Sequence, residues 1–212
     1  STEVGRLLIR EAADQVIRCS MELGGNAPVL VFDDADISKA VEGIMVAKMR
    51  NGGAACTAAN RIYVQRPIAE KFTAEFTKAM NALHMGSPLE SGISLGASVS
   101  IKERDKIASF VDMAVKQGGL VMTGGKIPEG TGAFYPATVI TVKSDNEILK
   151  NEVFGPVAPI VIFDTDEEGI ALTHGTASGL ISYVFSVELG RWIRVFESID
   201  SGMVACHRGV CD

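Results

Sequence analysis

Short apolar runs alternate with longer amphipathic stretches along almost the whole chain of 212 residues. Segment 28–32 is nearly all apolar, whereas the stretch after it repeats apolar side chains at Ile37, Val41 and Ile44, on one helical face. Strands that are apolar along their length need cover on both faces, so the alternation predicts a layered α/β/α fold with a mostly parallel sheet. Strands are predicted at 16–22, 28–32, 61–65, 120–122, 134–142, 157–163, 180–186 and 203–206, and helices at 3–14, 36–50, 67–84, 98–117, 166–174 and 188–200.

Composition and charge narrow the classes of function. The 20 Lys and Arg residues against 26 Asp and Glu residues give a net charge of −6, which disfavours nucleic-acid and anionic-membrane partners. No apolar run approaches the roughly 20 residues that span a bilayer. Charged side chains interrupt residues 1–20, so no signal peptide is expected there. We therefore expect a soluble, cytoplasmic protein with no nucleic-acid or membrane partner.

Cysteine and histidine spacing argues against a metal centre. The four cysteines form no C-x-x-C pair and the three histidines form no H-x-x-x-H pair, which are the spacings typical of structural zinc sites. Four scattered cysteines are also too few for a secreted disulfide scaffold. No metal is expected, and Cys206 and Cys211 are expected to pack or to lie near a cut end of the chain.

A cysteine follows the glycine turn that ends the predicted helix 36–50. Cys56 comes directly after Asn51-Gly-Gly-Ala-Ala, where flexible backbone exposes a loop. Backbone N–H groups freed by such a turn can stabilise a thiolate and later an oxyanion, so Cys56 is a candidate nucleophile. The alternative is a small apolar side chain that is buried and inert.

Two acidic segments are candidates for proton transfer and ligand binding. Glu22 ends the predicted strand 16–22 beside two glycines, and a carboxylate at the carboxyl end of a strand is well placed as a general base. Glu152 and Phe154 precede a Gly-Pro turn, where an acid can accept hydrogen bonds from sugar hydroxyls and an aromatic side chain can cover a flat ring. The alternatives are a solvated acid at a strand end and an ordinary turn before a strand.

Taken together, these segments resemble the aldehyde dehydrogenase superfamily. Met-Glu-Leu-Gly-Gly-Asn contains Glu22, Cys56 lies 34 residues later, and Glu152 in Glu-Val-Phe-Gly-Pro lies 96 residues after Cys56. The resemblance extends from Ser1 to about Val210. Gly-Gly-Asn-Ala-Pro, Asp-Asp-Ala-Asp and Ala-Asn-Arg-Ile-Tyr-Val-Gln are similar to the succinate-semialdehyde dehydrogenase branch.

The resemblance implies a mechanism that uses NAD or NADP. Cys56 would attack an aldehyde to form a thiohemiacetal, and hydride transfer to the nicotinamide would leave a thioester. Glu22 would activate the water that hydrolyses this thioester to the acid. Glu152 would accept hydrogen bonds from the nicotinamide ribose, and Phe154 would pack near the nicotinamide.

The resemblance also implies further binding residues. Ser1 and Gly5 match the start of a helix whose N-terminus faces the cofactor pyrophosphate, although the glycine that precedes this serine in the family is absent. Arg50 would bind the distal carboxylate of succinate semialdehyde; the alternative is a cation that interacts with a helix C-terminus.

Three positions depart from the family pattern. Ala54 stands where the family usually has Gln, so support for the loop is altered. Ala58 stands where some relatives have a second Cys, so a redox-switch disulfide at that position is not expected. His207 stands where Asn is usual and is expected to be a structural variation.

The resemblance divides the chain into 1–20, the end of a nucleotide-binding domain, and 21–212, the catalytic domain. We expect a homo-oligomer, a dimer or tetramer, for the full-length protein. The 212 residues alone are expected to fold without dehydrogenase activity, because most of the nucleotide-binding domain lies upstream in relatives. The alternatives are an inactive domain that serves assembly and a Cys-His hydrolase.

Overall fold

A seven-stranded sheet forms the centre of the computed structural model, which describes residues 1–207 and 209. The strand order is β3-β4-β5-β2-β1-β6-β7. β3 pairs with β4 antiparallel, and the other neighbouring strands pair in parallel. The strands are β1 (Ala27–Val31), β2 (Ala59–Gln65), β3 (Leu120–Thr123), β4 (Thr138–Thr141), β5 (Val157–Phe163), β6 (Ile181–Phe185) and β7 (Met203–Cys206).

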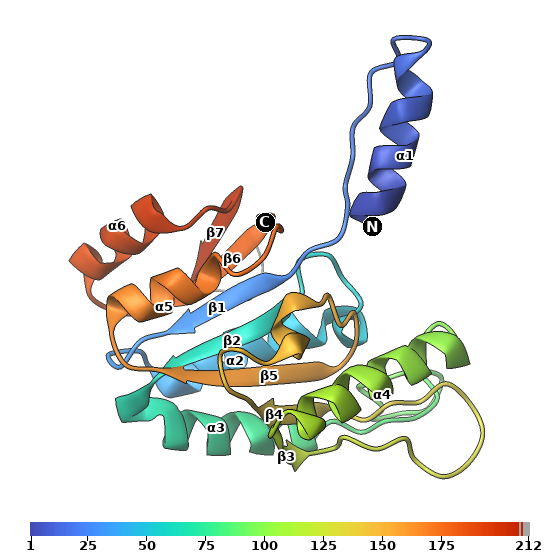
Figure 1. The fold of residues 1–212 in the computed structure, drawn as a ribbon. Helices are drawn as coiled ribbons and strands as arrows, with labels where there is room; N and C mark the ends of the chain where they lie inside the picture. The colour runs from blue at the N-terminus through green and yellow to red at the C-terminus, as the bar shows by residue number, and fades with distance from the viewer. Residues whose placement is uncertain (208, 210–212) are drawn as a thin grey trace.

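Helices cover both faces of this sheet (Figure 1). Val29 and Val31 of β1 pack in the cluster on the side of α2 and α3, whereas Leu30 packs in the cluster on the side of α4 and α6. All residues of β1, β2 and β6 are buried, so the predicted layered α/β fold with a mostly parallel sheet is confirmed. The helices are α1 (Thr2–Ala13), α2 (Ile37–Met49), α3 (Arg66–Asn81), α4 (Ile101–Lys116), α5 (Asp166–Thr173) and α6 (Leu189–Ser198), with the 3-10 helices η1 (Arg50–Gly53) and η2 (Glu147–Lys150).

The strand predicted at 16–22 is wrong. This segment is an extended connection between α1 and β1 with no strand partner among the described residues. Val16 is 91% exposed and has a φ of 54°, a left-handed conformation that is incompatible with a strand. Apolar side chains favour a strand only where a neighbouring strand and a buried face are available.

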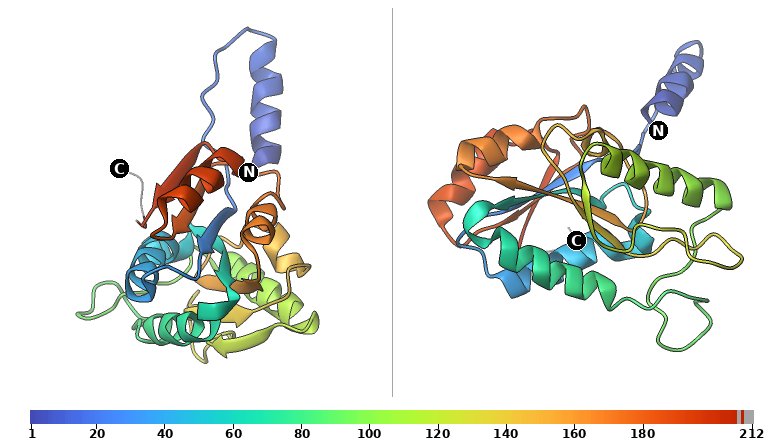
Figure 2. Two further views of the ribbon diagram at one scale, coloured as in Figure 1. Left: turned by 90° about the vertical axis from the view of Figure 1, so that its left-hand side faces the viewer. Right: turned by 60° about the horizontal axis from the view of Figure 1, so that its bottom comes forward.

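α1 projects away from the sheet, as Figures 1 and 2 show. Its N-terminal turn contacts the rest of the chain through Gly5, which is buried against Leu23. Apolar side chains further along α1, including Leu7 and Leu8, are exposed. Among the described residues, no helix combines the length and the apolar character that crossing a membrane requires.

Candidate functional site

The three chemistry-bearing segments meet at one edge of the sheet. Glu22 precedes β1, Cys56 precedes β2, and Glu152 and Phe154 precede β5. Since β5, β2 and β1 are adjacent and parallel, the amino ends of these strands bring the segments together. The expected position of Glu22 at the carboxyl end of a strand is therefore wrong, because segment 16–22 is not a strand and the next strand begins after Glu22.

A cavity of about 500 Å³ opens at this edge. It contains five of the side chains predicted as site residues, from four separate parts of the sequence, together with lining residues that the sequence analysis did not single out as site residues. The lining residues are Ser1, Glu22, Leu23, Gly24, Ala54, Ala55, Cys56, Lys106, Glu152 and Phe154.

Two adjacent glycines allow the segments to approach this closely. A Cβ atom on Gly25 would clash with the carbonyl oxygen of Cys56, and one on Gly24 would clash with the carboxylate of Glu152. A Cβ atom on a third glycine, Gly53, would clash with the backbone of Gly155, and Gly53 also has a φ of 80°. Side chains at these positions would force the nucleophile loop and the acidic segment apart.

The loop that carries Cys56 is held by hydrogen bonds on both sides of the thiol. The side-chain amide of Asn51 donates to Ala54 O at 2.9 Å, and Ala58 N donates to Ala55 O at 3.0 Å across a turn that contains Cys56. The hydroxyl of Tyr183 in β6 donates to Thr57 O at 2.8 Å. The thiol itself is partly exposed and lines the cavity, so a small molecule in the cavity can reach it.

Glu152 and Phe154 flank a buried anchor. Val153 is fully buried in the sheet core, which directs its two neighbours outward. Glu152 Oε1 accepts a hydrogen bond from Gly25 N at 2.9 Å, so the acidic segment and the glycine segment are directly bonded. Phe154 has a φ of 54° and is 41% exposed, which places an aromatic ring at the wall of the cavity.

Comparisons with known proteins fit this arrangement. The model of the aldehyde dehydrogenase family matches residues 1–210. The chain belongs to the aldehyde dehydrogenase family. It is 46% identical over 211 residues to succinate-semialdehyde dehydrogenase of Paenarthrobacter nicotinovorans, covering 99% of this chain and 47% of the relative.

Two further succinate-semialdehyde dehydrogenases match the chain over almost its whole length. The chain is 38% identical over 211 residues to the NADP(+) succinate-semialdehyde dehydrogenase GabD of Escherichia coli strain K12, covering 99% of this chain and 44% of the relative. The crystal structure of succinate-semialdehyde dehydrogenase from Burkholderia pseudomallei superposes with a TM-score of 0.97 at 39% identity, covering 100% of this chain and 44% of that one. This aldehyde dehydrogenase chain thus spans less than half the length of these relatives.

The N-terminal turn of α1 forms part of the cavity. The Ser1 hydroxyl caps the helix by accepting from Val4 N at 3.4 Å, and Ser1 lines the cavity. Gly5 does not line the cavity. It packs against Leu23, which follows Glu22, and a side chain at position 5 would clash with Leu23. The positive end of the helix dipole is therefore directed at this edge of the sheet.

Two predicted site residues have exposed side chains. Glu22 lines the cavity and is exposed. Arg50, the C-cap of α2, is exposed and is not among the residues that line the cavity with Cys56, so its role in binding a carboxylate stays a prediction. Three successive positive φ angles after it, 52° at Asn51, 62° at Gly52 and 80° at Gly53, turn the chain between Arg50 and the thiol.

Sequence reasoning missed Lys106 and the buried amides Asn26 and Asn60. Lys106 lies on α4, far from the motifs in sequence, and reaches the cavity only through the tertiary fold. Asn26 and Asn60 stand inside the motifs quoted above. Asn26 follows Gly25, and Asn60 lies in a buried strand; a polar amide at either place indicates a buried hydrogen bond.

The described histidines do not line the cavity with Cys56, which removes support for a Cys-His hydrolase. His207 packs its ring against Trp192, with 4.8 Å between ring centroids. In the part of the chain that the structure describes, no group of three or more His, Cys, Asp or Glu side chains could hold a metal ion. The expectation for Cys206 stays a prediction, and Cys211 lies outside the described residues.

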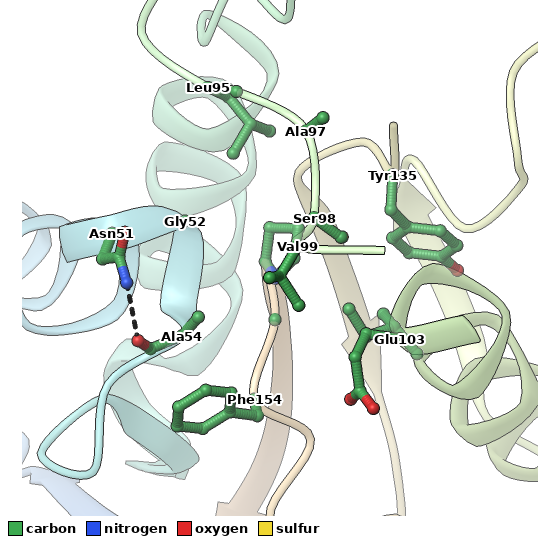
Figure 3. A pocket seen from close by; sticks show the side chains of 14 residues that line it. Asn51, Gly52, Ala54, Leu95, Ala97, Ser98, Val99, Glu103, Tyr135 and Phe154 are labelled. Atoms are coloured by element: carbon green, nitrogen blue, oxygen red, sulfur yellow. Dashed lines mark hydrogen bonds between the residues drawn. The ribbon is translucent and has the colours of Figure 1, made fainter. Parts of the chain in front are cut away.

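A second cavity, of about 560 Å³, adjoins the first and shares Ala54 and Phe154 with it. Figure 3 shows Asn51 and Ala54 on one side of this cavity and Tyr135 and Glu103 on the other. The side chain of Ala54 is a methyl group and makes no hydrogen bond, whereas its carbonyl oxygen accepts the Asn51 bond shown as a dashed line.

Proposed function

We propose that the protein carrying this chain oxidises an aldehyde to a carboxylic acid with NAD or NADP, and that this chain supplies the nucleophile and the base. The observation that carries the proposal is the single cavity lined by Cys56, Glu22, Glu152 and Phe154. These are the residue types that nucleophilic attack, water activation and binding of a ribosyl-nicotinamide require.

In this proposal, the Cys56 thiolate attacks the aldehyde carbon and forms a thiohemiacetal. When bound beside Glu152 and Phe154, NAD or NADP would supply the hydride acceptor that takes the thiohemiacetal to the oxidation level of a thioester. With the acyl group on Cys56, Glu22 takes a proton from a water molecule as the water attacks the thioester carbonyl. The exposure of Glu22 gives water direct access to its carboxylate. The acid leaves, and the thiolate is regenerated.

The residues at the cavity fit a dinucleotide. The capped N-terminus at Ser1 offers backbone N–H groups to phosphate. Glu152 offers a carboxylate to ribose hydroxyls, Lys106 offers a cation, and Phe154 offers an aromatic face to a flat ring. Gly5 supports this arrangement because it lets α1 approach Leu23.

For the substrate we propose a semialdehyde such as succinate semialdehyde. The names of the relatives support this choice. Arg50 would bind the distal carboxylate, since its guanidinium is exposed and forms no ion pair with the residues that the structure describes. Since Arg50 does not line the cavity with Cys56, other parts of the protein would complete the pocket.

We also propose the division into 1–20, belonging to a nucleotide-binding domain, and 21–212, the catalytic domain. The projection of α1 from the sheet supports this boundary (Figure 1). A cytoplasmic homo-oligomer, dimer or tetramer, completes the proposal. The 212-residue chain alone is expected to give no turnover, because a single helix of the cofactor domain cannot enclose a dinucleotide.

A chimaera tests the function. The matching segment of the Escherichia coli relative is replaced by this chain, and NADPH formation from succinate semialdehyde is followed by absorbance. We expect turnover that Cys56→Ala abolishes and Glu22→Gln lowers by at least 100-fold. A folded, NADP-binding chimaera without turnover would overturn the proposal.

The second candidate is an inactive domain that serves assembly, which the unusual Ala54 favours. It predicts that the Cys56 thiol of this chain reacts with iodoacetamide no faster at neutral pH than an ordinary thiol, and that Ala54→Gln restores turnover to an inactive chimaera.

A further inference from the structure

A buried pair of side-chain amides joins the three strand ends that carry the site. Asn26 and Asn60 are 4% and 3% exposed, and Asn60 Nδ2 donates to Asn26 Oδ1 at 2.7 Å. Asn60 Nδ2 also donates to Asn151 O at 2.8 Å, and Asn26 Nδ2 donates to Leu149 O at 2.9 Å. The pair thus links β1, β2 and the segment before β5.

The amide pair and its partner Asn151 stand next to the two residues that join the acidic segment to the glycine segment. Asn26 follows Gly25, whose N–H donates to Glu152, and Asn151 precedes Glu152. The donor of the Gly25–Glu152 bond is therefore one residue from Asn26, and its acceptor is one residue from Asn151, whose carbonyl Asn60 bonds. Asn60 lies four residues after Cys56 and fixes the end of its loop.

The network is buried, since Asn26 and Asn60 are almost fully shielded from solvent. Both hydrogens of the Asn60 amide are used, so removal of this side chain would take the donor from Asn151 O and from Asn26 Oδ1, whereas Leu149 O would lose its donor only with Asn26. The segment before β5 would then be free to shift relative to β1 and β2, and Glu152 would shift with it.

We propose that Asn60, through its bonds to Asn26 and Asn151, is a positioning residue that holds the Glu152 carboxylate for the cofactor ribose. This role rests on the proposed function, whereas the geometry of Glu152 can be measured without any cofactor.

The first experiment follows amide exchange of Gly25 in the 212-residue chain by NMR. Asn60→Ala is expected to raise its exchange rate at least tenfold, because the bond to Glu152 loosens. Gln65→Ala is the matched control: Gln65 is a buried amide at the other end of β2 that bonds Asp33 N and Asp164 O. Equal exchange rates at Gly25 in the two variants would overturn the proposal; if Asn60→Ala does not fold, Asn60→Ser, which keeps one donor, replaces it.

The second experiment measures NADP+ binding by calorimetry in the chimaera. Asn60→Ala is expected to weaken binding about tenfold in the wild-type background and to have no further effect in the Glu152→Ala background. An equal loss in both backgrounds would show that Asn60 acts on stability alone and would contradict the positioning role. A chimaera that binds no NADP+ would count against the proposed function, while the exchange result at Gly25 would still decide the role of Asn60.

Discussion

Individual residues decide how closely the site segments approach. Gly24 and Gly25 are required where they stand because a Cβ atom at either position would clash, with the Glu152 carboxylate and the Cys56 carbonyl oxygen respectively. The sequence showed two glycines beside Glu22, and the structure shows that they allow close contact between segments. The two glycines therefore allow the segment of Glu22 to lie against the Cys56 loop and the Glu152 segment.

Lys48 is a residue whose position costs stability. It is fully buried in α2, and its ammonium nitrogen has no hydrogen-bond partner in the described part of the chain. Burial lowers the pKa of Lys48 to about 7. Since its pKa in the unfolded chain is about 10.4, the unfolded state binds more protons between these values, and stability rises with pH from 7 to 10.

We expect Lys48→Met to raise the free energy of unfolding by a few kcal/mol at pH 6.5, because a buried charge is removed. The gain should shrink as the pH approaches 10. Urea denaturation at pH 6.5, 8 and 9.5 measures it, with the exposed Lys116→Met as control. A gain that does not depend on pH would contradict the assignment of this cost to Lys48.

At the scale of elements, helix ends lie within three residues of the predicted ends, since side chains near in sequence make the caps; the largest differences are the start of α4 at Ile101 rather than 98 and the end of α3 at Asn81 rather than 84. Asp36, Ser100 and Thr165 each cap the helix that follows, accepting from the backbone N–H three residues on. Strands were predicted less well, because pairing depends on distant segments. The strand expected at 134–142 shortens to Thr138–Thr141, and Pro136, which lacks an N–H group, lies in the part that does not pair.

One element is anchored by a carboxylate at the opposite edge of the sheet. Asp34 Oδ2 accepts from Ser186 Oγ, Val187 N and Glu188 N, each at 2.9 Å, at the start of α6. Desolvation raises the pKa of Asp34, but these bonds and the charge of Arg191 outweigh it, so the pKa of Asp34 is lowered overall.

We expect Asp34→Asn to lower the free energy of unfolding by about 1–2 kcal/mol at pH 7. A lowered folded pKa means that the contribution of Asp34 is complete above its ordinary value and is lost as the pH falls through the folded value. Thermal unfolding at pH 7, 5 and 3.5 should show a difference that is constant down to pH 5 and smaller at pH 3.5. The exposed Asp145→Asn is the control, and a difference that grows in acid would refute the prediction.

At the scale of the whole molecule, the stability of the sheet does not depend on α1. α1 contacts the rest of the chain at its N-terminal turn, and residues 14–20 are all exposed. In Figure 2 the helix projects beyond the body in both views. Loss of α1 would leave both clusters of buried core side chains intact, since they contain none of its residues.

We expect brief trypsin treatment of a Lys126→Gln variant to cleave first after Arg18, in the exposed connection. The Lys126 change removes a competing site in an exposed loop. Mass spectrometry identifies the product 19–212, and circular dichroism should show that its thermal transition is unchanged. Arg18→Gln should slow the cleavage, and a transition that shifts by more than a few degrees would show that α1 stabilises the sheet.

The sequence by itself determined the layered α/β class, most of the element order and the three motifs, because periodicity and local spacing depend on neighbours along the chain. Cys56, Glu22, Glu152 and Phe154 were all found in this way. Only the tertiary structure decided that they meet at the amino ends of β1, β2 and β5, and that Lys106 and the Asn26–Asn60 pair join them. The physical reason is that strand order results from how the crossover helices pack on the sheet, which depends on contacts between segments far apart in the sequence.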